Sequence, residues 1–95
     1  MAGHRIVADL LVPLDTASDV PLSRQVYNGL RDAILRGDLA PGTRLPSSRR
    51  LAAYLAVSRT TVLAAYERLV AERLVVGAVG SGSRVSDHLP AKPIA

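Results

Sequence analysis

Apolar residues recur at helical spacing in three stretches of this 95-residue chain. The first stretch predicts a helix that begins at Pro21–Ser23 and ends at Gly37. Proline is well placed there, because its missing N–H would have no partner in a first helical turn. Glycine readily adopts the left-handed conformation that commonly ends a helix. The apolar stripe of this helix is formed by Leu22, Val26, Leu30, Ala33 and Ile34.

The other two stretches lie close together and predict a helix-turn-helix over residues 45–62. We expect the first helix of the pair over about residues 47–55 and the second over about residues 59–73. The two helices are expected to pack together through Leu51, Ala52, Leu55, Val57, Val62 and Ala65. On the second helix, Val62, Ala65, Tyr66 and Leu69 share one face, whereas Thr60, Ala64 and Glu67 point the other way.

The ends of this pair carry specific signals. Ser47 or Ser48 can cap the first helix and Ser58 the second, because a serine oxygen accepts an unpaired first-turn N–H. In the turn between the helices glycine is usual, but this chain has Ala56. If φ of Ala56 is positive, the alanine costs about 1 kcal/mol relative to glycine.

Two β-prone pieces flank a glycine-rich segment after the last helix. Leu74–Val76, Gly77–Ser83 and Arg84–Ser86 therefore predict a β-hairpin. A nucleotide-binding glycine loop is excluded, because no helix follows the segment and no Gly-Lys-Ser/Thr ends it. The predicted fold class is mainly α with a small β wing, namely a winged helix-turn-helix of three helices and a C-terminal hairpin.

The flanking segments complete the predicted organisation. Residues 1–20 are expected to be an N-terminal arm and linker, 21–86 the winged helix-turn-helix, and 87–95 the start of an interdomain linker. Within the arm, residues 6–14 predict an edge strand or an extended arm, since proline demotes a central strand. The short piece Thr43–Leu45 is expected to be extended.

The formal net charge of +4 falls entirely within residues 44–73. That segment has six arginines against Glu67 and Glu72, whereas the rest of the chain has six basic and six acidic residues. Localised positive charge favours binding of a polyanion through counterion release. A solvated arginine face is the alternative that charge alone leaves open.

Several functional classes lack the residues that they need. The chain has no cysteine, and His4 and His88 lie at opposite ends, so no metal-ligand set is evident. No paired carboxylates or nucleophile–base arrangement is present, and we therefore expect no enzyme activity. The apolar run near the N-terminus is too short to span a bilayer and is a poor secretory signal. We expect no membrane association and a cytoplasmic, nucleoid-associated location.

Four motifs carry a family resemblance: Leu45-Pro46-Ser47-Ser48-Arg49, Ser58-Arg59-Thr60-Thr61-Val62, Ala65-Tyr66-Glu67-Arg68-Leu69 and Gly80-Ser81-Gly82-Ser83. With them, about residues 20–86 resemble the GntR family of bacterial winged-helix transcription regulators, and most closely its MocR/PdxR branch. The resemblance implies sequence-specific binding of a double-stranded DNA operator. A winged helix used only for protein–protein contact is the alternative function.

The resemblance also implies which residues contact DNA. Arg49, with Arg59, Thr60 and Thr61 at the start of the recognition helix, falls on the family's DNA-contacting positions, and Gly80 falls on the wing glycine at the minor groove. From their chemistry, Ser58, Arg50 and Arg84 are expected to belong to the same interface. Leu63 stands where the family often has arginine, which favours a thymine-methyl contact instead of a guanine contact. Glu72-Arg73 stands where Glu-Gly is usual, which makes the helix end less defined and offers Arg73 to a phosphate.

Regulators of the MocR type have a large C-terminal domain that resembles fold-type I aminotransferases and binds pyridoxal phosphate through a lysine. The single lysine of this chain is Lys92, in the tail, so we expect no cofactor in this chain. The resemblance places the cofactor in a domain that is missing here. A homodimer on DNA is expected for the full-length regulator, because one small module contacts few base pairs.

Overall fold

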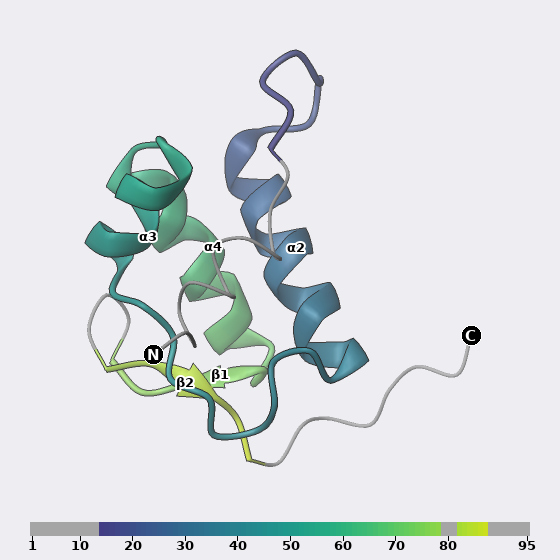
Figure 1. Ribbon diagram of the computed structural model, residues 1–95, viewed down its shortest axis with the longest axis vertical. Coiled ribbons are helices and arrows are strands. Elements are labelled where there is room, and N and C mark those ends of the chain that lie inside the picture. The colour runs from purple at the N-terminus through teal and green to yellow at the C-terminus, as the bar shows by residue number, and fades with distance from the viewer. Residues whose placement is uncertain (1–13, 79–81, 88–95) are drawn as a thin grey trace.

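The computed structural model describes residues 14–78 and 82–87. In these residues it has three helices and one two-stranded sheet, in the order α2 (Leu22–Arg36), α3 (Ser48–Leu55), α4 (Arg59–Ala71), β1 (Val75–Val76) and β2 (Arg84–Val85). Helix α4 lies between α2 and α3 and packs against both, and the antiparallel hairpin lies beyond the C-terminal end of α4 (Figure 1). This arrangement confirms the predicted winged helix-turn-helix.

Serine caps begin both helices of the helix-turn-helix. The Ser47 side chain accepts a hydrogen bond from the Arg50 backbone N–H at 3.1 Å. The Ser58 side chain accepts one from the Thr61 backbone N–H, also at 3.1 Å. Ser47 is therefore the cap of α3, and Ser48 is the first residue of that helix. Both caps satisfy N–H groups that have no partner within the helix.

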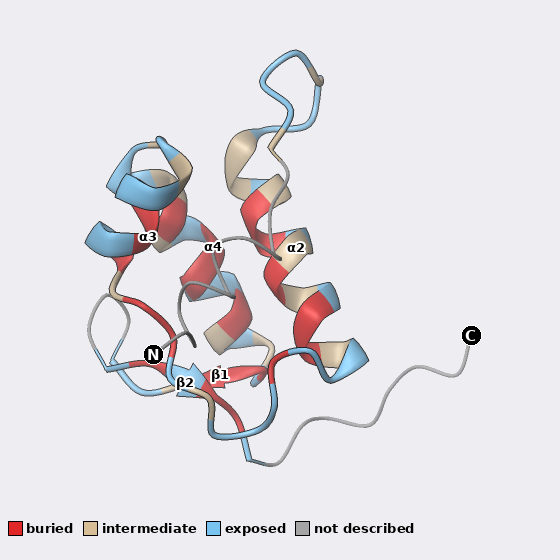
Figure 2. Cartoon of the chain, in the orientation of Figure 1, coloured by how far each residue is buried: buried red, intermediate tan, exposed pale blue. Residues whose placement is uncertain are grey.

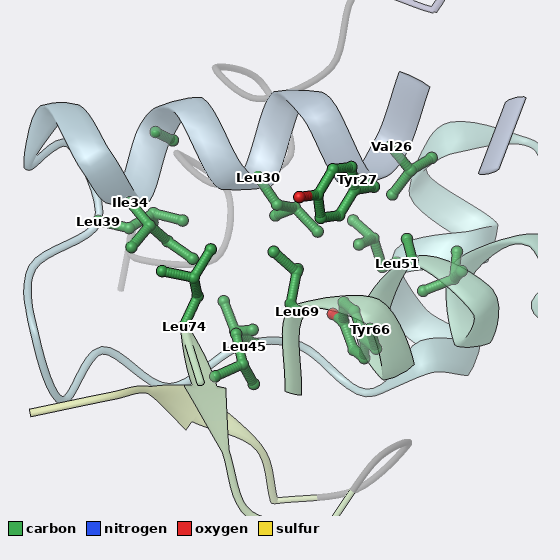
Figure 3. Packing of buried hydrophobic residues seen from close by; sticks show 14 of the residues in the cluster. Val26, Tyr27, Leu30, Ile34, Leu39, Leu45, Leu51, Tyr66, Leu69 and Leu74 are labelled. Atoms are coloured by element: carbon green, nitrogen blue, oxygen red, sulfur yellow. The ribbon is translucent and has the colours of Figure 1, made fainter. Parts of the chain in front are cut away.

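Helix α2 packs against α4 through its apolar stripe. Val26, Leu30 and Ala33 of this stripe are fully buried, but Leu22 at its start is only half-buried. Figure 2 shows the buried residues on the sides of the helices that face one another. In the core, Leu30 and Tyr27 of α2 lie over Leu69 and Tyr66 of α4 (Figure 3). The core is thus built from aliphatic residues and two tyrosines.

In the turn between α3 and α4, Ala56 has the positive φ considered for it from the sequence. Ala56 has φ 57° and ψ 44°, in the left-handed region. The backbone N–H of Val57 donates to the carbonyl of Ala52 at 3.0 Å, which closes the end of α3. A residue with a Cβ is strained in this region by about 1–2 kcal/mol.

Ala56→Gly is therefore expected to raise the free energy of unfolding by about 0.5–1 kcal/mol, because glycine adopts a positive φ without that strain. Urea denaturation followed by circular dichroism measures the change. Ala53→Gly is the matched control, since Ala53 is exposed inside α3 with ordinary helical geometry. Glycine there should lower stability by about the same amount. A loss of stability in both variants would show that the turn at Ala56 is not strained.

Helix α4 ends at Ala71, whereas the spacing of apolar residues predicted an end near residue 73. The reason is a left-handed turn at Arg73, whose φ is 64°. The N–H of Arg73 donates to the carbonyl of Val70 at 2.9 Å, and the N–H of Leu74 donates to the carbonyl of Leu69 at 3.0 Å. This pair of hydrogen bonds is the Schellman pattern, which normally has glycine where Arg73 stands.

The segment that leads into α3 pairs with the hairpin, which the sequence pattern did not predict. Thr43–Leu45 lies beside β2, and the backbone N–H of Val85 donates to the carbonyl of Thr43 at 2.8 Å. The N–H of Leu45 donates to the carbonyl of Ser83 at 3.0 Å. On its other side, β2 pairs with β1 so that Val85 lies opposite Val75. The wing is therefore attached directly to the chain that enters the helix-turn-helix.

Residues 15–20, predicted as a linker, form a turn that is held against α2. The Gln25 side-chain oxygen accepts from the Asp15 N–H at 2.8 Å, and its nitrogen donates to the carbonyls of Asp15 and Val20 at 3.0 and 2.8 Å. Leu14 is half-buried against the core. The rest of the predicted arm at 6–14, and the tail from residue 88, lie outside the described residues.

None of the three helices in the described part of the chain is long and apolar enough to cross a membrane.

Candidate nucleic-acid interface

The N-terminal turns of α3 and α4 present arginine and threonine side chains to solvent. Arg49 and Arg50 lie in the first turn of α3, and Arg59 and Thr60 in the first turn of α4. All four are exposed. The structure therefore places these predicted site residues on the two helices that form the helix-turn-helix, outside its packed core.

Arg59 is connected to α3 by a hydrogen bond that the sequence motifs did not reveal. Its Nε donates to the Oγ of Ser48 at 3.1 Å. Ser48 is fully buried, so its side chain is held by the packing around it. A guanidinium has N–H donors on three nitrogens, and this hydrogen bond uses only Nε. The two terminal nitrogens thus remain available for two parallel hydrogen bonds to another group.

The next residues of α4 differ in how much of each side chain is exposed to a binding partner. The Thr61 hydroxyl lies 2.8 Å from the Ser58 hydroxyl, and Thr61 is half-buried. Ser58 and Thr61 therefore serve the N-terminal cap of α4. Leu63 is half-buried on the flank of the helix, and Ala64 is exposed one turn after Thr60. The side chain of Ala64 is only a methyl group, so α4 presents little bulk at this position.

The hairpin residues lie apart from this helical surface. Arg84 is exposed on β2. Gly80, the predicted wing glycine, lies outside the described residues, which include none of 79–81. The structure brings Arg84 instead beside Arg44, since these two residues form an antiparallel bridge. Arg44 was not among the predicted site residues, because an extended piece of three residues does not indicate its pairing partner.

Most of the exposed arginines on α3, α4 and the small sheet form no ion pair with a carboxylate in the described residues. In the described residues the ion pairs are Arg31–Asp32, Arg36–Asp38 and Arg68–Glu72. None of them involves Arg44, Arg49, Arg59 or Arg84. The positive charge of these side chains is thus not compensated within the described part of the chain, and it remains available to an anionic partner.

Two buried tyrosines fix the position of α4. The Tyr66 hydroxyl donates to the carbonyl of Pro46 at 2.7 Å, immediately before α3. Burial raises the pKa of Tyr66 well above its ordinary value. The Tyr27 hydroxyl of α2 donates to a Glu72 carboxylate oxygen, and the Arg68 guanidinium lies 4.4 Å from the centre of the Tyr27 ring. Burial, and next the hydrogen bond to Glu72, raise the pKa of Tyr27.

The described residues include no group of three or more histidine, aspartate and glutamate side chains that could hold a metal ion. They also include no lysine, so they do not fit a pyridoxal phosphate held as a Schiff base. The exposed first turns of α3 and α4 offer hydrogen-bond donors and positive charge.

Comparison with known sequences identifies relatives of this chain. The family of bacterial regulatory proteins called gntR matches residues 22–85. The probable rhizopine catabolism regulatory protein MocR of Rhizobium meliloti is 45% identical over 80 residues, which are 84% of this chain and 16% of MocR. The pyridoxine biosynthesis transcriptional regulator PdxR of Corynebacterium glutamicum is 37% identical over 84 residues, 88% of this chain and 18% of PdxR. The chain thus spans less than a fifth of either relative.

Comparison with solved structures finds the same fold. YtrA from Sulfolobus acidocaldarius, a GntR-family transcription factor, superposes with a TM-score of 0.76 at 33% identity over 83% of each chain. The DNA-binding domain of AraR in complex with operator ORE1 superposes with a TM-score of 0.65 at 28% identity, over 79% of this chain and 92% of that domain.

Proposed function

The chain belongs to the gntR family of bacterial regulatory proteins, with relatives in its MocR/PdxR branch, and on this basis we propose that it binds double-stranded DNA sequence-specifically. Its role is that of the DNA-binding domain of a bacterial transcription regulator. The observation that carries this proposal is the exposed arginine cluster at the N-terminal turns of α3 and α4, in which Arg49 and Arg59 have no carboxylate partner. The AraR domain, which has this fold, was solved on its operator.

In this proposal α4 is the recognition helix and lies in the major groove. Arg59 donates from its terminal nitrogens to O6 and N7 of a guanine, because a guanidinium matches these two acceptors. Thr60 donates to a base edge or a phosphate from the same turn. Leu63 contacts a thymine methyl group, and the small side chain of Ala64 lets the helix approach the bases.

The remaining predicted residues position the domain on the duplex. Arg49 and Arg50 at the start of α3 contact phosphates or neighbouring base edges, and the cap formed by Ser58 and Thr61 presents the N-terminus of α4 to the DNA backbone. At the wing, Gly80 approaches the minor groove and Arg84 contacts the backbone. Contacts of this kind fix register and orientation, whereas base contacts provide the specificity.

The larger regulator is part of the proposal. Two copies act on a repeated operator, because one module contacts few base pairs. Pyridoxal phosphate belongs to another domain of that regulator, since the residues described here do not fit it. This chain contributes DNA binding and no catalysis, and it acts in the cytoplasm at the nucleoid.

Selection of duplexes from a random pool tests the proposed function with the 95-residue chain itself. We expect enrichment of one short motif. The selected duplex should bind more tightly than a scrambled duplex of the same composition, and log Kd for both should rise linearly with log salt concentration. Selection without enrichment, together with binding that does not respond to salt, would contradict the proposal and favour a protein-contact module.

A further inference from the structure

We propose that Arg44 and Arg84 together form a cradle for one phosphate of the DNA backbone, on the outer face of the small sheet. The inference rests on the proposed function, and it adds a phosphate site in which Arg44 acts together with Arg84. The two residues are 40 positions apart in the sequence, and the pairing of Thr43–Leu45 with β2 brings them together.

The hydrogen-bond pattern shows how the two residues face each other. The bonds on either side of the bridge join Leu45 to Ser83 and Val85 to Thr43. Arg44 and Arg84 are therefore a directly opposed, non-hydrogen-bonded pair, which is the arrangement that brings side chains closest in an antiparallel ladder. Directly opposed residues also project from the same face of a sheet.

Burial shows which face this is. The neighbours of the two arginines, Leu45, Ser83 and Val85, are buried, whereas Arg44 and Arg84 are exposed. The alternation places both guanidinium groups on the solvent side. In the described residues no ion pair involves either arginine. The acidic residue nearest to Arg84 in the sequence is Asp87. Its carboxylate lies near Gly42, where a Cβ built on the glycine would be 3.3 Å from Oδ1 of Asp87.

Two opposed arginines without an acidic partner repel each other in the free protein. An anion bound between them removes this repulsion, and a phosphodiester oxygen pair matches the planar guanidinium donors. The same short segment continues through Pro46 into α3, whose first turn has Arg49 and Arg50. This short segment thus joins the cradle to the helical turn that has the other proposed DNA contacts.

The test compares Arg44→Gln with Arg36→Gln, which removes the same charge at the far end of α2. Arg44→Gln is expected to raise the urea midpoint at low salt, because the repulsion between the two arginines is removed. It is also expected to weaken binding of the selected and of the scrambled duplex equally, by about five- to tenfold in Kd. The slope of log Kd against log salt should fall by about 0.9, as for one lost phosphate contact. Arg36→Gln should leave duplex affinity within about twofold.

Arg84→Gln and the double variant make the test specific to a shared phosphate. If both arginines hold one phosphate, the double variant should bind only slightly more weakly than either single variant. Inorganic phosphate should raise the urea midpoint of the wild type above that in chloride of equal ionic strength, and raise it less for Arg44→Gln. Unchanged duplex affinity of Arg44→Gln, or a loss confined to the selected duplex, would overturn the cradle. If the wild type bound no duplex, the proposed function itself would fail.

Discussion

Arg59→Ala is expected to weaken binding of the selected duplex by about 1–3 kcal/mol, which is roughly five- to 150-fold in Kd. A bidentate contact to guanine is lost, and no neighbouring side chain of α4 can replace it. The scrambled duplex should lose much less affinity, because non-specific binding depends on phosphate contacts. Titration of both duplexes at one fixed salt concentration, below the unfolding transition of the variant, measures the two effects separately.

Arg59→Lys is the control for charge. Lysine retains the positive charge but has neither a planar fork nor an Nε donor that reaches Ser48 in the same way. We expect it to restore affinity for the scrambled duplex and not for the selected one. Equal losses for the two duplexes in Arg59→Ala would contradict base recognition and assign Arg59 to the DNA backbone.

The hydrogen bond between Arg59 and Ser48 adds a second measurement on the same site. Ser48→Ala removes the oxygen that accepts from Nε at 3.1 Å, and a hydrogen bond of this kind contributes about 0.5–1.5 kcal/mol. The guanidinium then gains other orientations, so the selected duplex should bind about three- to tenfold more weakly. In an Arg59→Ala background, Ser48→Ala should have no further effect. A further loss there would show that Ser48 acts through the packing of α3.

The positions of the helices could be predicted from the sequence because local signals and tertiary packing agree. Ser47 and Ser58 are caps in the structure, Gly37 ends α2 in a left-handed conformation, and Ala56 has the positive φ considered for it. Each of these features depends on the backbone within a few residues. The apolar periodicity then determines which faces of the helices meet.

Features that depend on distant residues could not be predicted in this way. The bridge between Arg44 and Arg84 joins strands of two to three residues, which have no periodicity of their own. The hydrogen bond from Arg59 to Ser48 depends on how α3 and α4 cross. Arg73 ends α4 in a conformation that arginine disfavours, because the pairing of the hairpin and the burial of Leu74 determine the path of the chain. Tertiary packing outweighs local preference at this position.

Tyr66 is the residue through which the core holds the helix-turn-helix together, and its truncation is expected to have the largest effect on stability. Tyr66→Ala should lower the free energy of unfolding by about 3–5 kcal/mol, as large-to-small changes at buried aromatic residues do. A domain of this size has only about 5–10 kcal/mol in total, so this variant approaches global unfolding. Urea denaturation at neutral pH measures the loss.

Tyr66→Phe separates the hydrogen bond from the ring. The ring still fills the core, but the carbonyl of Pro46 loses the hydroxyl that donates to it at 2.7 Å. An unsatisfied buried carbonyl costs about 1–3 kcal/mol, and we expect a loss in that range. Tyr54→Phe is the matched control, because Tyr54 is about half exposed and should tolerate the change. Equal stability of the two variants would show that the hydrogen bond to Pro46 contributes nothing.

The pH dependence of stability provides an independent measurement of the same hydroxyl. Because burial raises the pKa of Tyr66 in the folded state above the ordinary value of 10.0, the unfolded chain releases this proton first as pH rises. The contribution of Tyr66 is therefore fully present below pH 10 and is lost progressively above it. Tyr66→Phe should flatten the decline of stability above pH 10, whereas Tyr54→Phe should not. Since Tyr66 does not reach the exposed face of α4, Tyr66→Phe should still bind the selected duplex normally while folded, unlike Arg59→Ala.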